Sequence, residues 1–400
     1  MLGRLILSFI PIAGTGSNST APVVTVSPYD YIVVGAGPSG IIVADHLSEA
    51  GKNVLLIERG GPSTTETGGA DVPPWTSTTN LTRFDIPGLY ESVFSAPSPY
   101  WWCDDVQTGA ACIIGGGTAV NGLLYWYPTD AEWAISNGWP SGWQKPNIAL
   151  KKVKVRLPST DTPSTDGKRY QTQLYNVVKS ILDKQSYSAL TINENRNSKD
   201  HIYGHPNYYV GTAKARSNFK LMPNTKVLSL IRNGAQITGV RTNNTSINGN
   251  GTISLTSKGR VILSAGPFGT AKILFGSGIG PADQTVFIAA DSTLSKYLPP
   301  SSQYINLPVD PVDKAVMMDA INDLVSTYKQ VPNLELIAPD NRTSLDAHIP
   351  QVLHSPSHWM GSTKIGTSSS SSVVDTNTKG AIFVMAENAV AKILALSGGA

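Results

Sequence analysis

Cysteine and clustered charge are both scarce in this sequence. Only two of the 400 residues are cysteines, Cys103 and Cys112, and they have neither the spacing nor the neighbours of a zinc site. Charged residues make up 15% of the chain, the net charge is +3, and no long run of Lys or Arg occurs. A metal ion is therefore not expected, and neither is a nucleic-acid partner, which would need a basic surface.

The apolar run at the N-terminus, residues 1–13, is too short to cross a bilayer. It has one early Arg and ends in small residues, which is the pattern of a signal peptide; a frayed terminal tail is the alternative. Asn-x-Ser/Thr sites fit secretion and occur at Asn18, Asn80, Asn243, Asn244, Asn250 and Asn341. We therefore expect a secreted protein with no membrane partner.

The two cysteines lie close together in the sequence, on either side of a short loop. In an oxidising compartment such a pair forms a disulfide, whereas in a cytosol it stays reduced. Because the chain has the features of a secreted protein, we predict a disulfide between Cys103 and Cys112.

The chain is organised around residues 30–61, which read DYIVVGAGPSGIIVADHLSEAGKNVLLIERGG. The apolar run at 31–34 predicts a strand buried on both faces of a parallel sheet. Apolar residues at helical spacing follow and stop at Gly51, and a second apolar run at 54–57 predicts another strand. The stretch is therefore expected to form one βαβ unit.

Within this unit Gly35, Gly37 and Gly40 form G-x-G-x-x-G, whose glycines permit a tight turn, close approach of a pyrophosphate and close packing of the next helix. Pro38 opens the helix, where its missing N–H costs nothing. Glu58 lies 18 residues after the last glycine, where a carboxylate can accept hydrogen bonds from ribose hydroxyls. A purely conformational glycine turn is the alternative. The complete context instead predicts a dinucleotide site, for NAD or FAD.

A second glycine-rich segment, residues 111–128, reads ACIIGGGTAVNGLLYWYP. Its three successive glycines and Thr118 leave backbone N–H groups free to face an anion, and Asn121 adds a side chain that can donate and accept hydrogen bonds. A flexible surface loop is the alternative.

Periodicity predicts further helices and strands along the chain. Asn233-Gly234 is expected to join strands at 218–233 and 236–242 in a hairpin, and Asp310-Pro311 to begin a helix that runs to about Tyr328. The other expected elements are helices at 165–185, 271–275 and 387–396 and a strand at 260–265.

Three motifs, in this order, resemble the glucose–methanol–choline (GMC) oxidoreductase family. They are GAGPSG with the later ERGG, GGGTAVNG with its trailing aromatic residues, and GPFGTAKILFGSGIG at 266–280; HWMGS, which begins at His358, completes the match. Within the family the chain most resembles the flavin domain of fungal cellobiose dehydrogenase. The resemblance covers most of the chain from Tyr29. It implies an α/β fold, with an FAD-binding, Rossmann-like parallel sheet and a second, reduced α+β substrate domain.

The resemblance implies FAD rather than NAD as the cofactor. The G-x-G-x-x-G turn would hold the pyrophosphate, Glu58 the ribose, the Val227 backbone the adenine, and residues 116–121 the flavin side. The residues expected to bind FAD are Gly35, Gly37, Pro38, Ser39, Gly40, Glu58, Arg59, Gly116, Gly117, Thr118, Asn121, Val227 and Ala265.

The activity implied by the family is oxidation of a CH–OH group of a small sugar or alcohol by hydride transfer to flavin, followed by transfer to an electron acceptor of unknown identity. His358 would take the hydroxyl proton, because a neutral imidazole has a pKa near neutrality. His354, four residues earlier, is a competitor, and the family motif HW-x-G alone favours His358.

Some segments of the family pattern are missing from this chain. The family's second His or Asn, in a stretch resembling N-P-x-G-T, has no counterpart after residue 374, and no substrate-domain sheet precedes Asp310. We expect residues 1–28 to be a signal or linker, 29–308 the FAD-binding domain with interleaved excursions, and 309–400 a shortened substrate-domain remnant with the C-terminal part of the FAD domain. Slow turnover is expected. A silent remnant that at most binds nucleotide is one alternative, and an NAD-dependent dehydrogenase, disfavoured by GGGTAVNG, is another.

Overall fold

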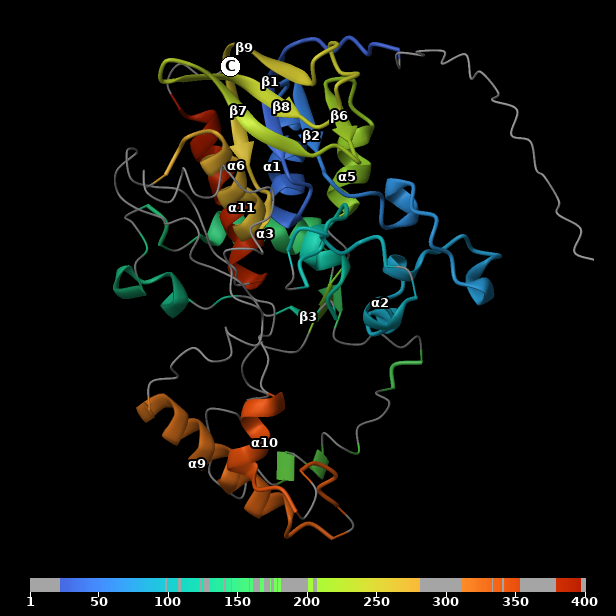
Figure 1. The fold of residues 1–400 in the computed structure, drawn as a ribbon, viewed down its shortest axis with the longest axis vertical. Helices are drawn as coiled ribbons and strands as arrows, with labels where there is room; N and C mark the ends of the chain where they lie inside the picture. Colours follow the sequence, from blue (N-terminus) through green and yellow to red (C-terminus); the bar gives the residue numbers. More distant parts are fainter. Residues whose placement is uncertain are drawn as a thin grey trace, which may run out of the picture.

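A computed structural model describes residues 22–280, 311–352 and 379–396, with gaps between residues 98 and 206, at 333 and at 340–341. Within these ranges six strands form one sheet in the order β6-β2-β1-β9-β8-β7 (Figure 1). Their bounds are β1 Tyr29–Val34, β2 Val54–Ile57, β6 Phe219–Met222, β7 Val227–Asn233, β8 Gln236–Thr242 and β9 Thr252–Leu263. β6, β2, β1 and β9 run parallel, and β8 and β7 extend the sheet antiparallel. The predicted α/β fold with a parallel sheet is confirmed.

The central strand β1 is buried on both faces, as its unbroken apolar run predicts. Tyr31 and Val33 belong to one core cluster, and Ile32 and Val34 belong to another on the opposite face of the sheet. The same alternation continues in β2, where every residue is buried. These two strands therefore hold the turn that follows β1 at a fixed place on the sheet edge.

Helices cover the first of these faces. They are α1 (Pro38–Glu49), α3 (Asn147–Arg156), α5 (Asn207–Lys214) and α11 (Lys379–Leu394), and their apolar side chains join the cluster around Tyr31. Strands β7 and β8 and helix α6 (Gly266–Gly276) supply side chains to the opposite cluster, among them Val227, Val240 and Ile273. Figure 1 shows α1, α3 and α11 close together beside the sheet. Residues far apart in sequence thus enclose the βαβ unit.

The peripheral elements are short. Three of them form a small antiparallel sheet, with β5 between β3 and β4. Their bounds, with those of the remaining helices, are β3 Leu124–Tyr125, β4 Ser159–Thr160, β5 His201–Tyr203, α2 Ser92–Ser95, α9 Pro311–Tyr328 and α10 Leu345–Val352. The 3-10 helices are η1 Thr65–Thr67, η2 Pro74–Thr76, η3 Arg83–Asp85, η4 Pro87–Leu89, η5 Gly116–Ala119, η6 Asp130–Trp133 and η7 Ile135–Asn137.

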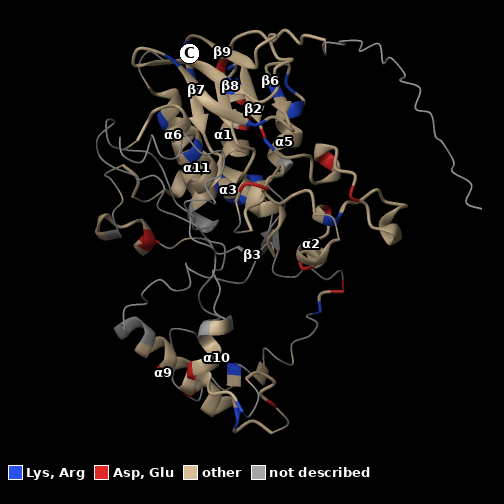
Figure 2. Ribbon diagram, viewed as in Figure 1, with Lys and Arg blue, Asp and Glu red and all other residues tan. Residues whose placement is uncertain are grey.

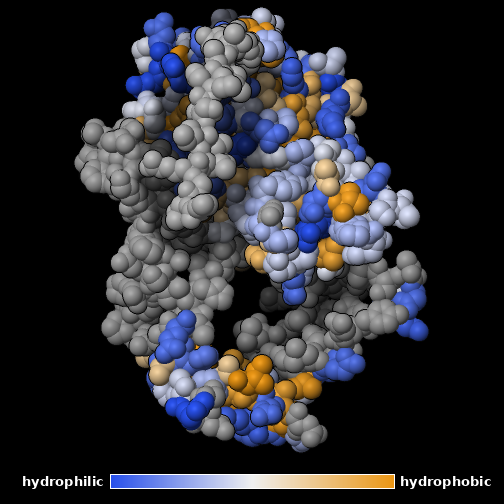
Figure 3. All heavy atoms as spheres, turned by 45° about the vertical axis from the view of Figure 1, so that its right-hand side comes forward, coloured by the Kyte–Doolittle hydropathy of each residue, from blue (hydrophilic) through white to orange (hydrophobic). Residues whose placement is uncertain are grey.

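The region of α9 and α10 buries little apolar surface. Met318 is the one buried apolar side chain described between residues 311 and 352, whereas Val316 and Ile337 are 64% and 91% exposed. In the space-filling view, apolar side chains lie on the surface of this part of the molecule (Figure 3). It therefore contributes little to the core around the sheet.

Charges of both signs occur around the sheet and around α9 and α10, rather than on separate faces (Figure 2). Of the helices that the structure describes, none has the length and apolar character needed to cross a membrane.

Four of the expected boundaries were wrong. The expected strand at 218–233 is two strands, β6 and β7, because Pro223 cannot donate to a ladder and Asn224 has a φ of 53°. β9 begins at Thr252 rather than 260, since its polar first half pairs with β8 and its apolar second half with β1. α6 spans more than 271–275, and α11 begins at Lys379 rather than 387.

Other expectations agree with the structure where it describes them. The hairpin at Asn233-Gly234 is confirmed, because Asn233 pairs with Gln236 across the turn. The helix that runs from Pro311 to Tyr328 is also confirmed. The expected helix at 165–185 lies largely outside the described residues.

Candidate cofactor-binding site

The G-x-G-x-x-G turn lies between the end of β1 and the start of α1. Gly35 has a φ of +100°, and a Cβ there would overlap with the carbonyl oxygen of Ser264. A Cβ on Gly40 would overlap with the carbonyl oxygen of Gly35. Gly37 differs, because no atom lies within 4 Å of the position its Cβ would take. Two of the glycines therefore permit packing, and the third faces open space.

Helix α1 begins at this open space. Gly37 is its N-cap residue, Pro38 is in its first turn, and Pro38 and Ser39 are half-buried. The first N–H groups of a helix have no partner within the helix, and the helix dipole is positive at this end. The space beside Gly37 is therefore suited to an anion such as a pyrophosphate.

Glu58, at the end of β2, lies against the same turn. Its Oε2 accepts a hydrogen bond of 2.8 Å from the Ala36 N–H, and its Oε1 accepts one of 2.9 Å from the Gly60 N–H. Burial raises the pKa of Glu58, and the backbone N–H groups of Gly60, Ala36 and Arg59, together with the charge of Arg59, oppose that shift. A carboxylate offers about four acceptor sites, so Glu58 can still accept a hydrogen bond from a further donor.

The second glycine-rich segment contacts the first. The Gly115 N–H donates to the carbonyl oxygen of Ala36 at 2.7 Å, and a Cβ on Gly116 would lie 3.0 Å from the Cα of Gly37. Thr118 is buried and its hydroxyl donates to the carbonyl oxygen of Gly115 at 2.6 Å. Gly117 is exposed, with no atom within 4 Å of its Cβ position. The segment thus borders the open space from a second side.

Ala265, the N-cap residue of α6, borders the turn from a third side. The Ser264 N–H donates to the carbonyl oxygen of Val34 at 2.7 Å, which continues the β1–β9 pairing to the end of both strands. A Cβ on Gly35 would lie 2.7 Å from the Cα of Ala265. Ala265 therefore lies directly behind the turn.

The connection from β6 to β7 runs beside Glu58. The Glu58 N–H donates to Met222, and the carbonyl oxygen of Glu58 accepts from the Thr225 N–H, both at 2.9 Å. Val227, two residues later, is buried at the start of β7. Val227 is expected to face the adenine, and Glu58 is expected to bind the ribose. Val227 therefore lies two residues after Thr225, which is hydrogen-bonded to Glu58.

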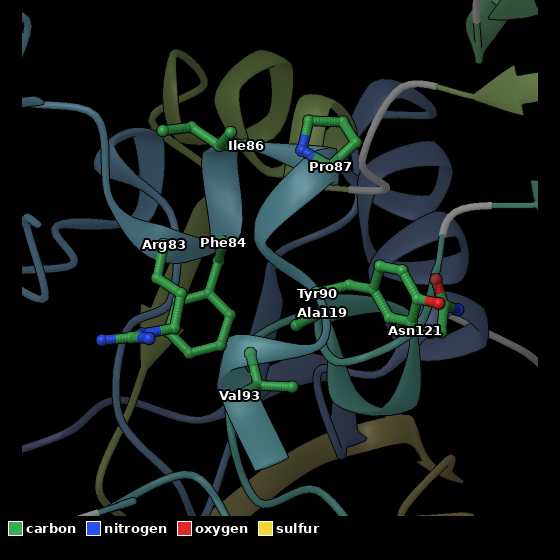
Figure 4. A pocket seen from close by; sticks show the side chains of 8 residues that line it. All are labelled: Arg83, Phe84, Ile86, Pro87, Tyr90, Val93, Ala119 and Asn121. Atoms are coloured by element: carbon green, nitrogen blue, oxygen red, sulfur yellow. The ribbon is translucent and has the colours of Figure 1, made fainter. Parts of the chain in front are cut away.

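Asn121 lies in a separate small cavity beneath the segment that contains η3 and η4. Its free volume is about 10 Å³, roughly room for one water molecule and far too little for a flavin ring. Figure 4 shows the ring of Tyr90 beside Asn121. The cavity is lined by Arg83, Phe84, Ile86, Pro87, Tyr90, Val93, Ala119 and Asn121. Asn121 is thus close to the glycine-rich segment but covered by another part of the chain.

Comparison with protein families accounts for this convergence of segments. The GMC oxidoreductase family model matches residues 29–299, which is more than half of the chain. The chain belongs to the GMC oxidoreductase family. Members of this family are FAD-binding flavoproteins, and the matched region contains every expected FAD-binding residue of this chain.

Individual GMC relatives are distant. The chain is 25% identical over 367 residues to the dehydrogenase eriK of Hericium erinaceus, covering 78% of this chain and 57% of the relative. It is 24% identical to the pyranose dehydrogenase of Agaricus campestris, covering 67% and 49%. The solved pyridoxine 4-oxidase of Mesorbium loti has a TM-score of 0.47 at 17% identity, over 66% of this chain and 55% of that one. The chain spans about half the length of the curated relatives it matches.

The residues around the turn fit an FAD molecule. The position beside Gly37 is one that a Cβ would fill, α1 points its N-terminus at it, and Glu58 presents acceptor sites next to it. The open position at Gly117 adds room on the side of the second glycine-rich segment. This GMC chain therefore has space, positive potential and an acceptor where a dinucleotide would need them.

The expected catalytic residue of this GMC chain, His358, lies outside the described residues, and so does its competitor His354. The assignment of the base therefore stays a prediction from the sequence, as does the assignment of the residues that bind the nucleotide.

The predicted disulfide is confirmed, since Cys103 and Cys112 are bonded. The loop it closes carries Asp105, a residue that sequence reasoning missed. Asp105 is buried, and its Oδ1 pairs with Arg59 at 2.5 Å. Burial alone would raise the pKa of Asp105, but hydrogen bonds from three basic side chains hold it well below its usual range. Two adjacent acids inside a short Cys-to-Cys loop were the one signal in the sequence.

Proposed function

We propose that this chain is an FAD-dependent oxidoreductase that oxidises a CH–OH group of a small sugar or alcohol. The observation that carries the proposal is the convergence of two glycine-rich segments and the start of α6 around the open position at Gly37, with Glu58 beside it. The family membership and the relatives named dehydrogenases support the reaction class.

The chain's own residues would divide the binding of FAD among them. The N-terminus of α1, from Gly37 to Ser39, would donate to the pyrophosphate, and Glu58 would accept from the adenosine ribose. The backbone of Val227 would face the adenine, and the part of the second glycine-rich segment that faces the open space, residues 116–118, would border the flavin. When bound, FAD would supply the hydride acceptor.

His358 is proposed as the base that takes the proton from the substrate hydroxyl. A neutral imidazole can do this near pH 7, and such proton transfer typically contributes about 10²- to 10⁴-fold to the rate. The acceptor that reoxidises the flavin is a small molecule or protein of unidentified class. A carbohydrate substrate, as in cellobiose dehydrogenase, remains part of the proposal.

Secretion is also proposed. The disulfide supports it, because disulfides persist in oxidising compartments. Four of the Asn-x-Ser/Thr asparagines, at positions 80, 243, 244 and 250, are exposed on the folded chain.

The proposal is tested by steady-state assays of flavin-loaded protein with cellobiose, glucose and aryl alcohols and an artificial electron acceptor. We expect slow but measurable reduction of the acceptor. His358→Gln should lower the rate by about 10²- to 10⁴-fold, and the matched control His354→Gln should leave it unchanged. Flavin-loaded protein with no activity on any of these substrates would instead favour a silent nucleotide-binding homologue.

A further inference from the structure

Three basic side chains meet at one buried carboxylate beside the candidate cofactor site. Asp105 is 6% exposed, and its Oδ1 pairs with Arg59. Its Oδ2 pairs with Lys226 at 2.8 Å and with Lys272 at 2.7 Å. The neighbouring acid, Asp104, reaches Arg59 only at 3.2 Å and has an almost fully exposed side chain. We call Asp105 and its three basic partners the Asp105 cluster.

Each base in the Asp105 cluster belongs to a segment that borders the candidate site. Arg59 follows Glu58 at the end of β2, Lys226 precedes Val227 at the start of β7, and Lys272 belongs to α6, whose N-cap is Ala265. Like charges held this close repel one another in a partly buried environment. Asp105 therefore offsets the repulsion among three bases that belong to three different segments around the candidate site.

The loop that carries Asp105 is itself fixed to the site. The Cys103–Cys112 bond closes it, and its base is paired by the hydrogen bonds Cys103 N–H to Ala110 at 2.9 Å and Cys112 N–H to Trp101 at 2.7 Å. A Cβ on Gly60 would overlap with the carbonyl oxygen of Cys112. The loop base thus lies directly against the segment that follows Glu58.

We propose that Asp105 is a positioning residue for the adenosine half of FAD, which acts by holding Glu58 and Val227 at the spacing that the ribose and adenine require. This inference rests on the proposed binding of FAD. Asp105 is not expected to contact the nucleotide itself, because it is buried and both of its oxygens pair with the three bases. Its effect on binding is transmitted through Arg59 and Lys226 to the residues next to them in the chain.

The test compares the binding of FAD and of ADP, which carries the adenosine half alone, to wild type and Asp105→Asn by isothermal titration calorimetry. We expect Asp105→Asn to raise the Kd for both ligands by the same factor, roughly tenfold, which lies within the usual range for coupling between sites. Asp104→Asn, the matched control, should change neither Kd. Asp105→Glu, which keeps the charge, should recover part of the ADP affinity.

The outcomes separate this inference from the proposed function. Wild-type protein that binds neither FAD nor ADP would overturn the proposed function, whereas wild-type binding with an unchanged ADP affinity in Asp105→Asn would overturn only the role of Asp105. If Asp105→Asn does not fold, Lys226→Met decides, because it leaves Asp105 paired with Arg59 and Lys272. A weaker ADP affinity in that variant supports the inference, and an unchanged one overturns it.

Discussion

Two buried aspartates, Asp45 and Asp105, organise different regions of this molecule with similar chemistry. Asp45 lies in α1 and is fully buried. It pairs with Arg156 from α3 and with Arg216 at 2.7 Å, and it accepts a hydrogen bond of 2.9 Å from the Thr212 hydroxyl in α5. Each of these partners thus belongs to the helical layer or to the segment that follows it.

The partners of Asp105 belong instead to the segments around the candidate cofactor site. The two clusters therefore have similar ion pairs but different neighbours. The residues that Asp105 joins adjoin the positions proposed to bind FAD, and those that Asp45 joins do not. Asp45 should therefore contribute to stability alone, and Asp105 to stability and nucleotide affinity together.

The largest expected effect is a loss of stability without a loss of FAD affinity, on substitution of Asp45. Asp45→Asn removes the charge that two partly buried arginines face, and loss of one partner of such a pair costs about 3 to 5 kcal/mol of unfolding free energy. Denaturant unfolding should show this loss, while the Kd for FAD at 25 °C stays unchanged. If the stability of Asp45→Asn matched that of wild type, the stabilising role assigned to Asp45 would be contradicted.

The disulfide should affect both the stability of the Asp105 region and its affinity for FAD. The double variant Cys103→Ser/Cys112→Ser is expected to lose about 2 to 3 kcal/mol of unfolding free energy, from the entropy of opening a loop of this length. Because the loop carries Asp105, the variant should also bind FAD more weakly, which fluorescence titration would measure. Unchanged FAD affinity would show that the loop holds its position without the bond.

Glu58 is a third buried carboxylate to compare with Asp45 and Asp105. Backbone N–H groups hold it, rather than cations. Glu58→Gln should weaken FAD binding by about 1 to 3 kcal/mol, the usual contribution of a hydrogen bond to a charged group. Calorimetric titration would measure the change. Full FAD affinity in this variant would show that Glu58 does not bind the ribose.

Ionisation of the Glu58 carboxyl group should make the affinity for FAD depend on pH. Burial raises the pKa of Glu58 above its ordinary value, so the unliganded protein takes up a proton there as the pH falls. Ribose hydroxyls donate to the ionised form, so FAD affinity should decrease as the pH falls through that raised pKa. The free energy of unfolding should change in the opposite direction and increase as the pH falls, because a raised carboxyl pKa favours folding at the lower pH. The affinity profile of Glu58→Gln should be flat over this range.

The smallest effect concerns His46, beside Asp45 in α1. Burial alone would lower the pKa of His46, but Glu387 in α11 at 2.9 Å and Glu49 at 2.7 Å raise it overall. The raised pKa adds stability that is complete below the ordinary value of 6.5 and is lost as the pH rises through the folded-state pKa. His46→Gln should lose this pH dependence in thermal melts, with FAD affinity unaffected. An identical pH profile in the variant would exclude the contribution.

The sequence predicted the parts of the fold that depend on local patterns. A few neighbouring residues are enough to predict the strands β1 and β2 from their apolar runs. The same holds for the glycine turn between them and for the position of Glu58. The hairpin at Asn233-Gly234 is equally local. The candidate cofactor site could be located because its main residues belong to such segments.

The sequence could not predict what depends on distant pairing. The polar first half of β9 is a strand because β8 lies beside it, and β6 lies at the opposite edge of the sheet from β7 because it pairs with β2. The Asp105 cluster joins residues 59, 105, 226 and 272, whose charges resemble solvated surface charges when each is taken alone. Only the folded chain shows that they meet.

The central claim is that the turn at Gly37 receives a dinucleotide. Gly37→Val and Gly88→Val offer a matched pair, because neither Cβ position has an atom within 4 Å and neither glycine has a positive φ. The most direct measurement is the flavin absorbance of each purified protein after loading with FAD and gel filtration. We expect wild type and Gly88→Val to retain FAD and Gly37→Val to emerge colourless, because its side chain fills the space for the pyrophosphate. Full flavin content in Gly37→Val would contradict the account.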